Sequence, residues 1–257
     1  MNILKDKIVV ITGSSSGIGK SCAFKFAAEG ARLIISARRN ERIESIAKKI
    51  KKEFQSDIYA STLDIRNQKQ VETFFHKLPK DWKEIDVLVN NAGLSRGLEK
   101  LHEAATENWE EMIDTNIKGL LYVSRAVIPG MVQRNSGMII NIGSIAGHEV
   151  YVGGNVYCAT KHAVDAITRG LRYDLVDTNI RVCTVDPGLV ETEFSMVRFK
   201  GDLERAKNVY KGLTPLSPDD VAEAVVWCAT RPPHVQVAQI LLLPTSQASA
   251  SLVNRKL

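Results

Sequence analysis

The sequence of 257 residues predicts an α/β protein, in which a parallel β-sheet is covered by helices on both faces. Two observations predict this class. Short apolar and β-branched runs alternate along the chain with longer segments of helical periodicity, and the apolar runs are continuous rather than alternating. Continuous runs are typical of strands buried on both faces, and the alternation is typical of βαβ units. Since no linker, repeat or biased segment divides the chain, we expect residues 1–257 to form a single domain.

Each element is expected from its own residue pattern. The first strand covers Ile8 to Thr12 and leads through a glycine-rich loop into a helix that begins after Gly17. The second strand is followed by a helix for which Asn40 is the expected N-cap. The strands are expected at residues 8–12, 32–37, 58–63, 87–90, 138–143, 181–185 and 240–243, and the clearest helices at about 40–53, 109–127 and 156–176. Pro79 is expected to end the third helix, and Ser217-Pro218-Asp219 to start the last one.

Composition excludes several classes of protein. The net charge of +5 arises from basic residues that are mixed with acids along predicted helices, which favours solvated helix faces over a nucleic-acid-binding patch. The four cysteines and five histidines have no ligand spacing, so neither a metal site nor a disulfide framework is expected. The first apolar run leads directly into the glycine loop, and no run reaches membrane-spanning length; we therefore expect a cytoplasmic protein.

The loop after the first strand has the composition of a phosphate-binding turn. It reads Thr12-Gly13-Ser14-Ser15-Ser16-Gly17-Ile18-Gly19 and opens a helix. Glycines at this place let the backbone approach a pyrophosphate, which free N–H groups and the positive end of the helix then stabilise. The alternative is a glycine turn that only packs the strand against the helix. The first interpretation predicts a Rossmann-type, doubly wound sheet with a dinucleotide at its carboxyl edge, although the spacing differs from the usual GxGxxG.

The end of the second strand indicates which dinucleotide is bound. An acidic residue there would receive the ribose 2′-hydroxyl and repel a 2′-phosphate. The strand instead ends in Ser36-Ala37-Arg38-Arg39. A charge-assisted contact between guanidinium and phosphate contributes about 1.5 to 3 kcal/mol, which favours NADP over NAD by roughly one to two powers of ten. Two ordinary surface arginines before a helix are the alternative.

From the glycine loop onward the chain resembles the short-chain dehydrogenase/reductase family. The motifs are TGxxxGxG at 12–19, NNAG at 90–93, Asn116, Ser144, Tyr157-x-x-x-Lys161, and Pro187-Gly188 with Thr192. The resemblance implies an oxidoreductase whose catalytic residues are Asn116, Ser144, Tyr157 and Lys161. It also implies a set of cofactor-binding residues, with Asp64 at the adenine: Thr12, Gly13, Ser15, Ser16, Gly17, Ile18, Gly19, Arg38, Arg39, Asp64, Ile65, Asn91, Ala92, Gly93, Tyr157, Lys161, Pro187, Gly188, Val190 and Thr192.

The spacing of Tyr157 and Lys161 supports proton transfer. Residues four apart project from one face of a helix, so the ammonium group can lie beside the phenol. A free phenol has a pKa near about 10, and a cation about 4 Å away contributes up to roughly 4 kcal/mol toward its ionisation. Tyr157 is therefore the expected acid/base, and Ser144 is expected to donate to the reacting oxygen. By resemblance, Lys161 also bonds the nicotinamide ribose, and Asn116 holds a water that links Lys161 to solvent.

Several longer stretches resemble the NADP-dependent 3-hydroxy acid dehydrogenase branch of the family, which includes serine 3-dehydrogenase and L-allo-threonine dehydrogenase. They include IDVLVNNAG, NIGSIAG, PGLVETEFSMVRFKG and LPTSQAS. This resemblance implies that the enzyme exchanges hydride with the 3-position of small acids such as serine, L-allo-threonine or 3-hydroxyisobutyrate, and with their 3-oxo forms. A substrate carboxylate needs a cation, for which we name Arg198 and Lys200 in a lid at about residues 190–215. Ser144, Tyr157 and Arg198 are thus the expected substrate-binding residues, while two exposed charges on a mobile lid are the alternative.

Other functions stay open from the sequence. A broad carbonyl or diketone reductase using NADPH has the same motifs. A non-catalytic dinucleotide-sensing protein is disfavoured because Tyr157 and Lys161 are both present. The resemblance also implies a homotetramer built on the helices near residues 109–127 and 156–176, although their apolar positions equally suit the protein's own core.

Overall fold

A parallel sheet forms the centre of the structure, a computed structural model that describes residues 3–256. Its seven strands follow the order β3-β2-β1-β4-β5-β6-β7. Because all neighbours are parallel, the carboxyl ends of the strands share one edge, and the order reverses between β1 and β4. The strands are β1 (Ile8–Thr12), β2 (Arg32–Ala37), β3 (Ile58–Thr62), β4 (Val87–Asn90), β5 (Gly137–Ile142), β6 (Ile180–Pro187) and β7 (Gln239–Leu242). The predicted doubly wound class is confirmed.

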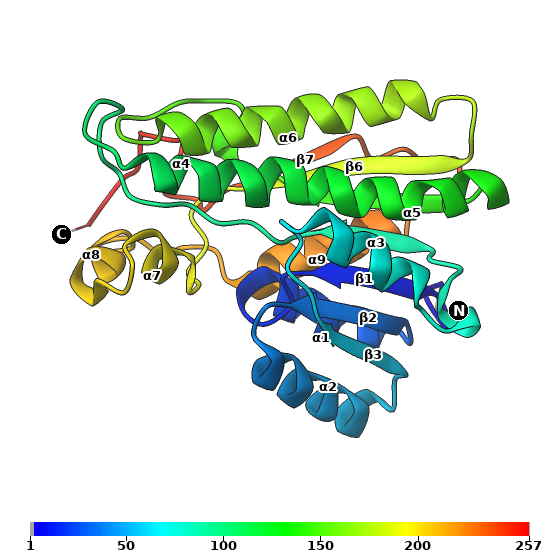
Figure 1. The fold of residues 1–257 in the computed structure, drawn as a ribbon. Coiled ribbons are helices and arrows are strands. Elements are labelled where there is room, and N and C mark those ends of the chain that lie inside the picture. Colours follow the sequence, from blue (N-terminus) through cyan, green and yellow to red (C-terminus); the bar gives the residue numbers. More distant parts are fainter. Residues whose placement is uncertain (1–2, 257) are drawn as a thin grey trace.

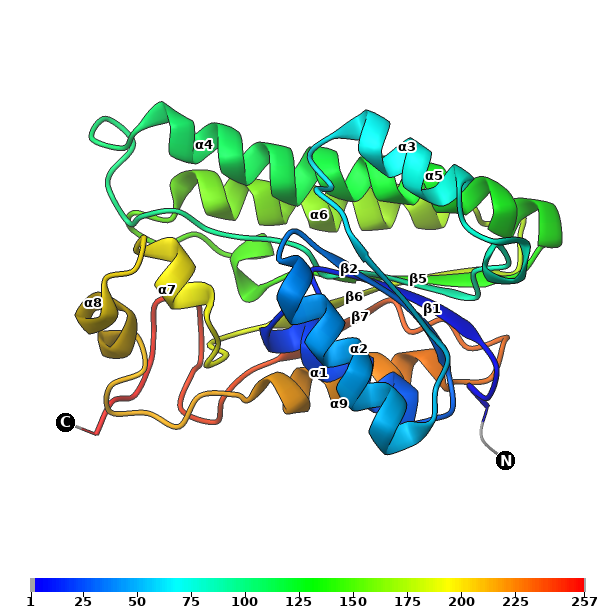
Figure 2. The ribbon, with the colours of Figure 1, turned by 60° about the horizontal axis from the view of Figure 1, so that its bottom comes forward.

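Helices cover both faces of the sheet (Figure 1 and Figure 2). On one face, α1 (Gly17–Ala28), α2 (Asn40–Phe54) and α9 (Pro218–Ala229) bury apolar side chains such as Phe26 and Val225. On the other, α3 (Gln68–His76), α5 (Leu120–Arg134) and α6 (Asn155–Asp174) contribute Val71 and Val123 to a second apolar layer. Two cores therefore hold the strands rigidly in register, as buried parallel strands require.

One segment lies outside this three-layer arrangement. It consists of the short helices α7 (Phe194–Arg198) and α8 (Leu203–Asn208), which follow β6 and lie beyond the carboxyl edge of the sheet (Figure 2). The segment lies within residues 190–215, the range for which the sequence predicts a lid, and we call these residues the lid.

The structure differs from the sequence prediction at two helix boundaries. Asn40 is the first helical residue of α2 rather than its N-cap, because its side chain bonds Thr62 and Glu44 instead of the helix backbone. The helix expected at 109–127 is divided into α4 (Thr106–Ile113) and α5 by a π-helical turn, η2 (Asp114–Gly119). The predicted start of α9 is confirmed, since Ser217 and Asp220 form a capping box. The third helix ends at His76, shortly before Pro79.

A buried polar network joins the two central strands to the helices above them. The Nδ2 of Asn90, at the end of β4, donates to Asn141 Oδ1 at 2.9 Å and to Ser124 Oγ at 3.0 Å. Asn141, on β5, donates in turn to Thr168 Oγ1 of α6 at 2.8 Å. Because buried amides are stable only when they are paired, this network fixes α5 and α6 relative to the sheet edge.

Within residues 3–256, no helix combines the length and apolarity that crossing a membrane requires, and no three potential metal ligands cluster. All four cysteines are buried and form no disulfide, and Cys183 Sγ donates a hydrogen bond to Cys228 Sγ at 3.6 Å.

Candidate active site

A cavity of about 730 Å³ opens at the carboxyl edge of the sheet. The glycine loop after β1, the ends of β2, β4 and β5, helix α6 and the lid all contribute to its walls. Ligands of doubly wound folds bind at this edge, next to the strand-order reversal. The cavity brings together most of the residues that the sequence singled out: Gly13, Ser15, Ser16, Gly17, Ile18, Arg38, Arg39, Asp64, Ile65, Asn91, Ala92, Gly93, Ser144, Tyr157, Lys161, Pro187, Gly188, Val190, Thr192 and Arg198.

The glycine loop has a backbone that needs glycine. Gly13 and Gly17 have φ angles of 68° and 53°, which L side chains rarely adopt. A Cβ atom on Gly13 would lie 2.8 Å from the Cα of Ala92, and one on Gly19 would lie 2.3 Å from Asn91 Nδ2. The loop is thus pressed against the start of the segment after β4, and its opposite side is left open to the cavity.

Hydrogen bonds between Thr12, Asn91 and Ala92, three of the expected cofactor residues, hold this loop against the segment after β4. Asn91 Nδ2 donates to the carbonyl oxygens of Thr12 at 2.8 Å and Gly13 at 3.2 Å. Thr12 Oγ1 accepts from the N–H groups of Asn91 and Ala92, each at 3.1 Å. Thr12 and Gly19 lie outside the cavity wall, so their contribution is to hold the loop in shape.

The start of α1 is suited to an anion. Its N-cap, Ser16, makes no side-chain hydrogen bond to the helix backbone, so the N–H groups of the first turn keep their capacity to donate to a ligand. Ser16 Oγ instead accepts from Arg39 Nη2 at 2.8 Å. Arg38 lines the same cavity with a half-exposed side chain, and its Nη1 lies 3.8 Å from Glu111 Oε1. The cavity wall therefore contains a helix N-terminus and two guanidinium groups.

The expected adenine residue is already paired. The carboxylate of Asp64 accepts from Arg66, with 2.9 Å between Asp64 Oδ1 and Arg66 Nε. This hydrogen bond and the charge of Arg66 hold the pKa of Asp64 below its usual value, so it stays ionised. Asp64 and Ile65 both line the cavity.

Lys161 is a buried cation on α6. Its Nζ donates to the carbonyl oxygen of Ile142, at the end of β5, at 2.8 Å. Burial lowers the pKa of Lys161 to about 8, and the carboxylate of Asp186 opposes this shift. Asp186 is itself buried, and His148 Nε2 lies 2.9 Å from its Oδ2. Sequence reasoning missed Asp186; its position two residues before Gly188, on a strand end, was the available signal.

Burial also dominates the pKa of Tyr157, which it raises above the usual phenol value. The positive charge of Arg198 and a hydrogen bond with Ser144 act in the opposite direction. Ser144 follows β5; its Oγ accepts from the N–H of Ala146 at 3.1 Å and lies 3.4 Å from the carbonyl oxygen of Pro187. In the protein alone, burial therefore keeps the phenol protonated, and the groups that act against it are Arg198 and Ser144 rather than Lys161, whose Nζ donates to Ile142 O.

Asn116 lies in the π-helical turn, behind the cavity wall. Its Oδ1 accepts from the N–H of Leu94 at 2.9 Å, while its Nδ2 donates to Leu94 O at 2.8 Å and to Thr160 Oγ1 at 3.0 Å. Such turns are frequent at functional sites because they redirect side chains. Here the turn directs Asn116 onto the segment after β4 and onto helix α6, between which the cavity lies.

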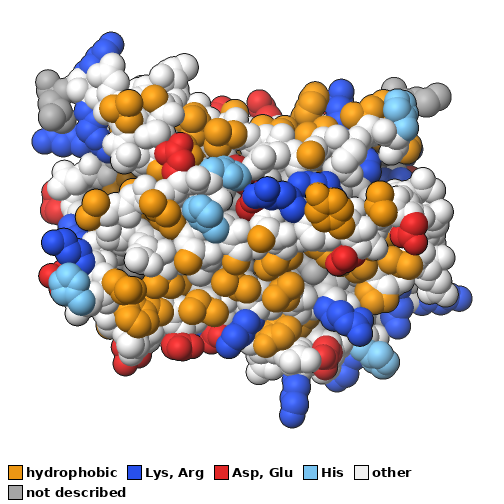
Figure 3. Space-filling view, turned by 90° about the horizontal axis from the view of Figure 1, so that it is seen from above, with side chains coloured by type: hydrophobic (Ala, Val, Ile, Leu, Met, Phe, Trp, Pro, Cys, Tyr) orange, Lys and Arg blue, Asp and Glu red, His pale blue; other side chains and the backbone are white. Residues whose placement is uncertain are grey.

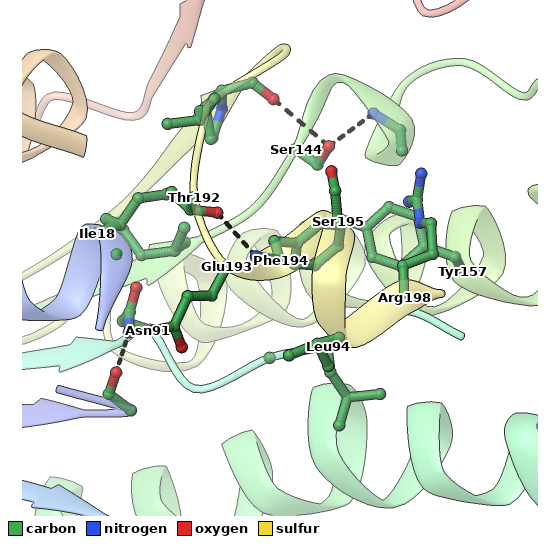
Figure 4. A pocket seen from close by; sticks show the side chains of 18 of the residues that line it. Ile18, Asn91, Leu94, Ser144, Tyr157, Thr192, Glu193, Phe194, Ser195 and Arg198 are labelled. Carbon is green, nitrogen blue, oxygen red and sulfur yellow. Dashed lines mark hydrogen bonds between the residues drawn. The ribbon is translucent and has the colours of Figure 1, made fainter. Parts of the chain in front are cut away.

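The lid brings a second cation, Arg198, to Tyr157. The guanidinium carbon of Arg198 lies 5.2 Å from the ring centre of Tyr157 and 5.1 Å from that of Phe194. Its Nη2 donates to Tyr151 Oη at 3.1 Å, and its Nε is buried without a hydrogen-bond partner in the described part of the chain. Figure 4 shows Arg198 beside Tyr157 in the pocket. Lys200, the other candidate, is exposed and outside the cavity wall.

Neighbouring backbone contacts fix the position of Arg198. The N–H of Gly97 donates to the carbonyl oxygen of Arg198 at 2.9 Å, and Arg96 donates to that of Val197. Arg96 is held by the carboxylate of Glu111 on α4, 2.6 Å away. Tyr151 and Arg96 were not foreseen, because neither belongs to a motif and both act through the three-dimensional packing of the lid.

These features fit a dinucleotide that carries a phosphorylated ribose. The glycine positions leave space that a Cβ would fill, the helix end can receive a pyrophosphate, and arginines stand where an acid would repel a 2′-phosphate. Beside them lie a buried tyrosine, lysine and serine around one end of the cavity. Fold and site together define a nicotinamide-dependent oxidoreductase.

Comparison with known proteins names the family. Residues 7–202 match the short chain dehydrogenase family, and the chain belongs to it. It is 49% identical to the NADP-dependent 3-hydroxy acid dehydrogenase YdfG of Salmonella typhi over 95% of this chain and 98% of that protein. It is 45% identical to the NADP-dependent 3-hydroxy acid dehydrogenase of Schizosaccharomyces pombe over 100% and 99%. A closed form of serine dehydrogenase complexed with NADP+ superposes with a TM-score of 0.90 at 46% identity, over 97% of this chain and 100% of that one.

Proposed function

We propose that this protein is an NADP-dependent dehydrogenase of small 3-hydroxy acids, of the serine, L-allo-threonine and 3-hydroxyisobutyrate type, and that it also reduces their 3-oxo forms. The observation that carries the substrate class is the position of Arg198, whose guanidinium group lies 5.2 Å from the Tyr157 ring centre. An acid whose hydroxyl reacts at Tyr157 has its carboxylate only a few bonds away. A cation at that distance with a free, buried Nε–H is therefore suited to the carboxylate.

In this proposal the glycine loop and the end of β2 hold the cofactor. The N–H groups at the start of α1 receive the pyrophosphate, and Arg38, Arg39 and Ser15 surround the 2′-phosphate. Asp64 and Ile65 border the adenine, and the segments containing Gly93, Gly188 and Thr192 border the nicotinamide half. The bound cofactor supplies the hydride acceptor or donor. Lys161 holds the nicotinamide ribose through its ammonium group.

The protein's own chemistry is the transfer of one proton. In the reduction direction, the protonated Tyr157 gives its proton to the substrate oxygen, while Ser144 donates a hydrogen bond that stabilises negative charge on that oxygen. In the oxidation direction Tyr157 must first lose its proton. Burial opposes this loss, and the cation of Arg198 favours it. In this proposal the ammonium group of Lys161 and an oxidised nicotinamide ring add further positive charge near the phenol. The Leu94–Asn116–Thr160 bonds keep Asn116 in place beside this relay.

The test is a spectrophotometric panel of hydroxy acids and neutral alcohols with NADP and NAD. We expect oxidation of serine, L-allo-threonine or 3-hydroxyisobutyrate with NADP, and much weaker reaction with neutral alcohols of equal size. Equal rates with neutral alcohols or diketones would identify a broad carbonyl reductase instead. Cofactor binding without turnover of any compound would identify a dinucleotide sensor.

The face of the molecule formed by α5 and α6 supports a homotetramer. Figure 3 shows hydrophobic side chains spread over this face. Leu121 and Val132 of α5 are 42% and 43% exposed, and Tyr173 in the last turn of α6 and Val176 just after it are 80% and 81% exposed. Exposed apolar side chains that gather on one face are typical of protein–protein contacts. Light scattering that gives the mass of one chain would contradict this assembly.

A further inference from the structure

An ion-pair group joins the lid to the opposite side of the cavity. The carboxylate of Glu193, at the start of α7, binds two arginines: its Oε2 is 2.7 Å from Arg39 Nη1, and its Oε1 is 2.6 Å from Arg42 Nη1. Arg39 also donates from Nε and Nη2 to Ser15 Oγ at 3.1 and 2.8 Å. We call the group of Arg39, Arg42 and Glu193 the strap.

The sheet topology makes the strap cross the cavity. Arg39 and Arg42 follow β2, whereas Glu193 follows β6, and three strands, β1, β4 and β5, lie between these two. All strands end at the same edge, so a contact between the two segments must pass over the carboxyl ends of the strands between them. Figure 4 shows Glu193 reaching from the lid toward the side of the cavity where Ile18 and Asn91 lie.

A dinucleotide in this fold lies along the same path. Its adenosine half lies by β2 and its nicotinamide half lies toward β6, with the pyrophosphate at the glycine loop. Arg39 follows β2, where the 2′-phosphate is expected, and already contacts Ser15 and Ser16 of that loop, so its guanidinium group lies between the expected places of the 2′-phosphate and the pyrophosphate. A guanidinium group has five N–H donors, which allows Arg39 to bond a phosphate oxygen and Glu193 at the same time.

We propose that the strap retains the cofactor: it closes the lid over the phosphate groups of the bound NADP, and the Glu193 pairs must break before the cofactor leaves. This inference rests on the proposed function. The side chains of Arg39, Arg42 and Glu193 are 42%, 49% and 44% exposed, so the pairs lie at the outer surface of the cavity. Exposed ion pairs are individually weak, so the strap can open each time the cofactor is released.

The opposite effect would follow if Glu193 competed with the cofactor. A carboxylate between two arginines resembles a bound phosphate, and a 2′-phosphate would then have to displace it. Removing its charge would in that case strengthen binding. Removal of the Glu193 charge should therefore weaken NADPH binding if the strap retains the cofactor, and strengthen it if Glu193 competes with the cofactor.

The experiment measures NADPH dissociation by stopped-flow fluorescence, with excess NADP as the displacing ligand and no substrate present. Glu193→Gln keeps the shape and removes the charge. Glu191→Gln, two residues earlier, is the matched control, since Glu191 is exposed and forms no ion pair among the described residues. Arg42→Gln removes one of the two pairs and leaves Arg39 in place.

Retention predicts that Glu193→Gln dissociates NADPH roughly three- to ten-fold faster than both the wild type and Glu191→Gln. Arg42→Gln should show a smaller increase, and the double variant Glu193→Gln with Arg42→Gln should release NADPH at the same rate as Glu193→Gln alone, because Arg42 acts through Glu193. Additive effects of the two changes would contradict the strap. An unchanged rate in Glu193→Gln, or tighter NADPH binding, would overturn the strap while leaving the proposed function standing. A wild type that does not bind NADPH would instead overturn the proposed function.

Discussion

Replacement of Arg198 by Met separates the binding of the substrate carboxylate from the chemistry. Met keeps an unbranched apolar stem that can pack against Tyr157 and Phe194, and it removes the guanidinium group that lies 5.2 Å and 5.1 Å from their ring centres. A charge-assisted hydrogen bond to a carboxylate contributes about 1.5 to 3 kcal/mol. The expected loss in kcat/KM for a 3-hydroxy acid is therefore roughly 10- to 150-fold.

A second consequence affects every substrate equally. Arg198 lowers the pKa of Tyr157, so its removal makes the phenol harder to ionise for any alcohol. The informative quantity is thus the ratio of the losses measured with a 3-hydroxy acid and with a neutral alcohol of the same size, both assayed by NADPH absorbance. We expect this ratio to be at least about 10.

Arg205→Met is the matched control. Arg205 lies in the same lid, with its guanidinium carbon 4.4 Å from the ring centre of Phe199, but it does not line the cavity. Arg205→Met should leave kcat/KM unchanged for both the 3-hydroxy acid and the neutral alcohol. If Arg198→Met reduces both substrate classes by the same factor, Arg198 has no part in recognising the carboxylate, and the substrate class rests on resemblance alone.

Three further changes test other parts of the site. Arg38→Gln should weaken NADP binding roughly 10- to 150-fold and leave NAD binding unchanged in calorimetric titrations, and equal effects on both cofactors would contradict the assignment of the 2′-phosphate. Asp186→Asn should move the alkaline limb of the kcat/KM profile for reduction to lower pH. The Asp186 carboxylate raises the pKa of Lys161, so without it this pKa falls below about 8 and the ammonium group loses its charge at lower pH. An unmoved alkaline limb would exclude Lys161 as the group that causes it. Asn141→Ala should lower the free energy of unfolding in urea by about 2 to 4 kcal/mol, since it removes one buried hydrogen bond from Asn90 and one from Thr168 and leaves a space in the core. A loss below about 0.5 kcal/mol would show that the network is not needed for stability.

The sequence was sufficient for the sheet and its edge. Strands such as residues 32–37 and 87–90 have the predicted bounds, because continuous apolar runs between helical segments fit one kind of environment. The glycine loop was likewise predictable, since its backbone angles and close contacts admit few other residues. The motifs at Ser144, Tyr157 and Lys161 were placed on one cavity wall because each follows or faces the end of a central strand.

Tertiary contacts between distant segments were not predictable. The π-helical turn at Asn116 carries no local signal that distinguishes it from an ordinary helix, and it exists where the side chain can bond Leu94. The pairing of Glu193 with Arg39 joins residues 154 positions apart. The pKa of Tyr157 illustrates the same point: spacing indicates a neighbouring cation, whereas only the packed structure shows how strongly burial opposes ionisation.

Proton transfer by Tyr157 is the central claim, and Tyr157→Phe tests it most directly. The phenyl ring keeps the contact with Phe194, whose ring centre lies 5.6 Å from that of Tyr157, and only the hydroxyl is lost. NADPH affinity, measured by fluorescence, should stay within about two-fold of the wild type, while the single-turnover rate of hydride transfer should fall by roughly two to four powers of ten. A variant that binds NADPH normally and transfers hydride at more than about a tenth of the wild-type rate would contradict the account.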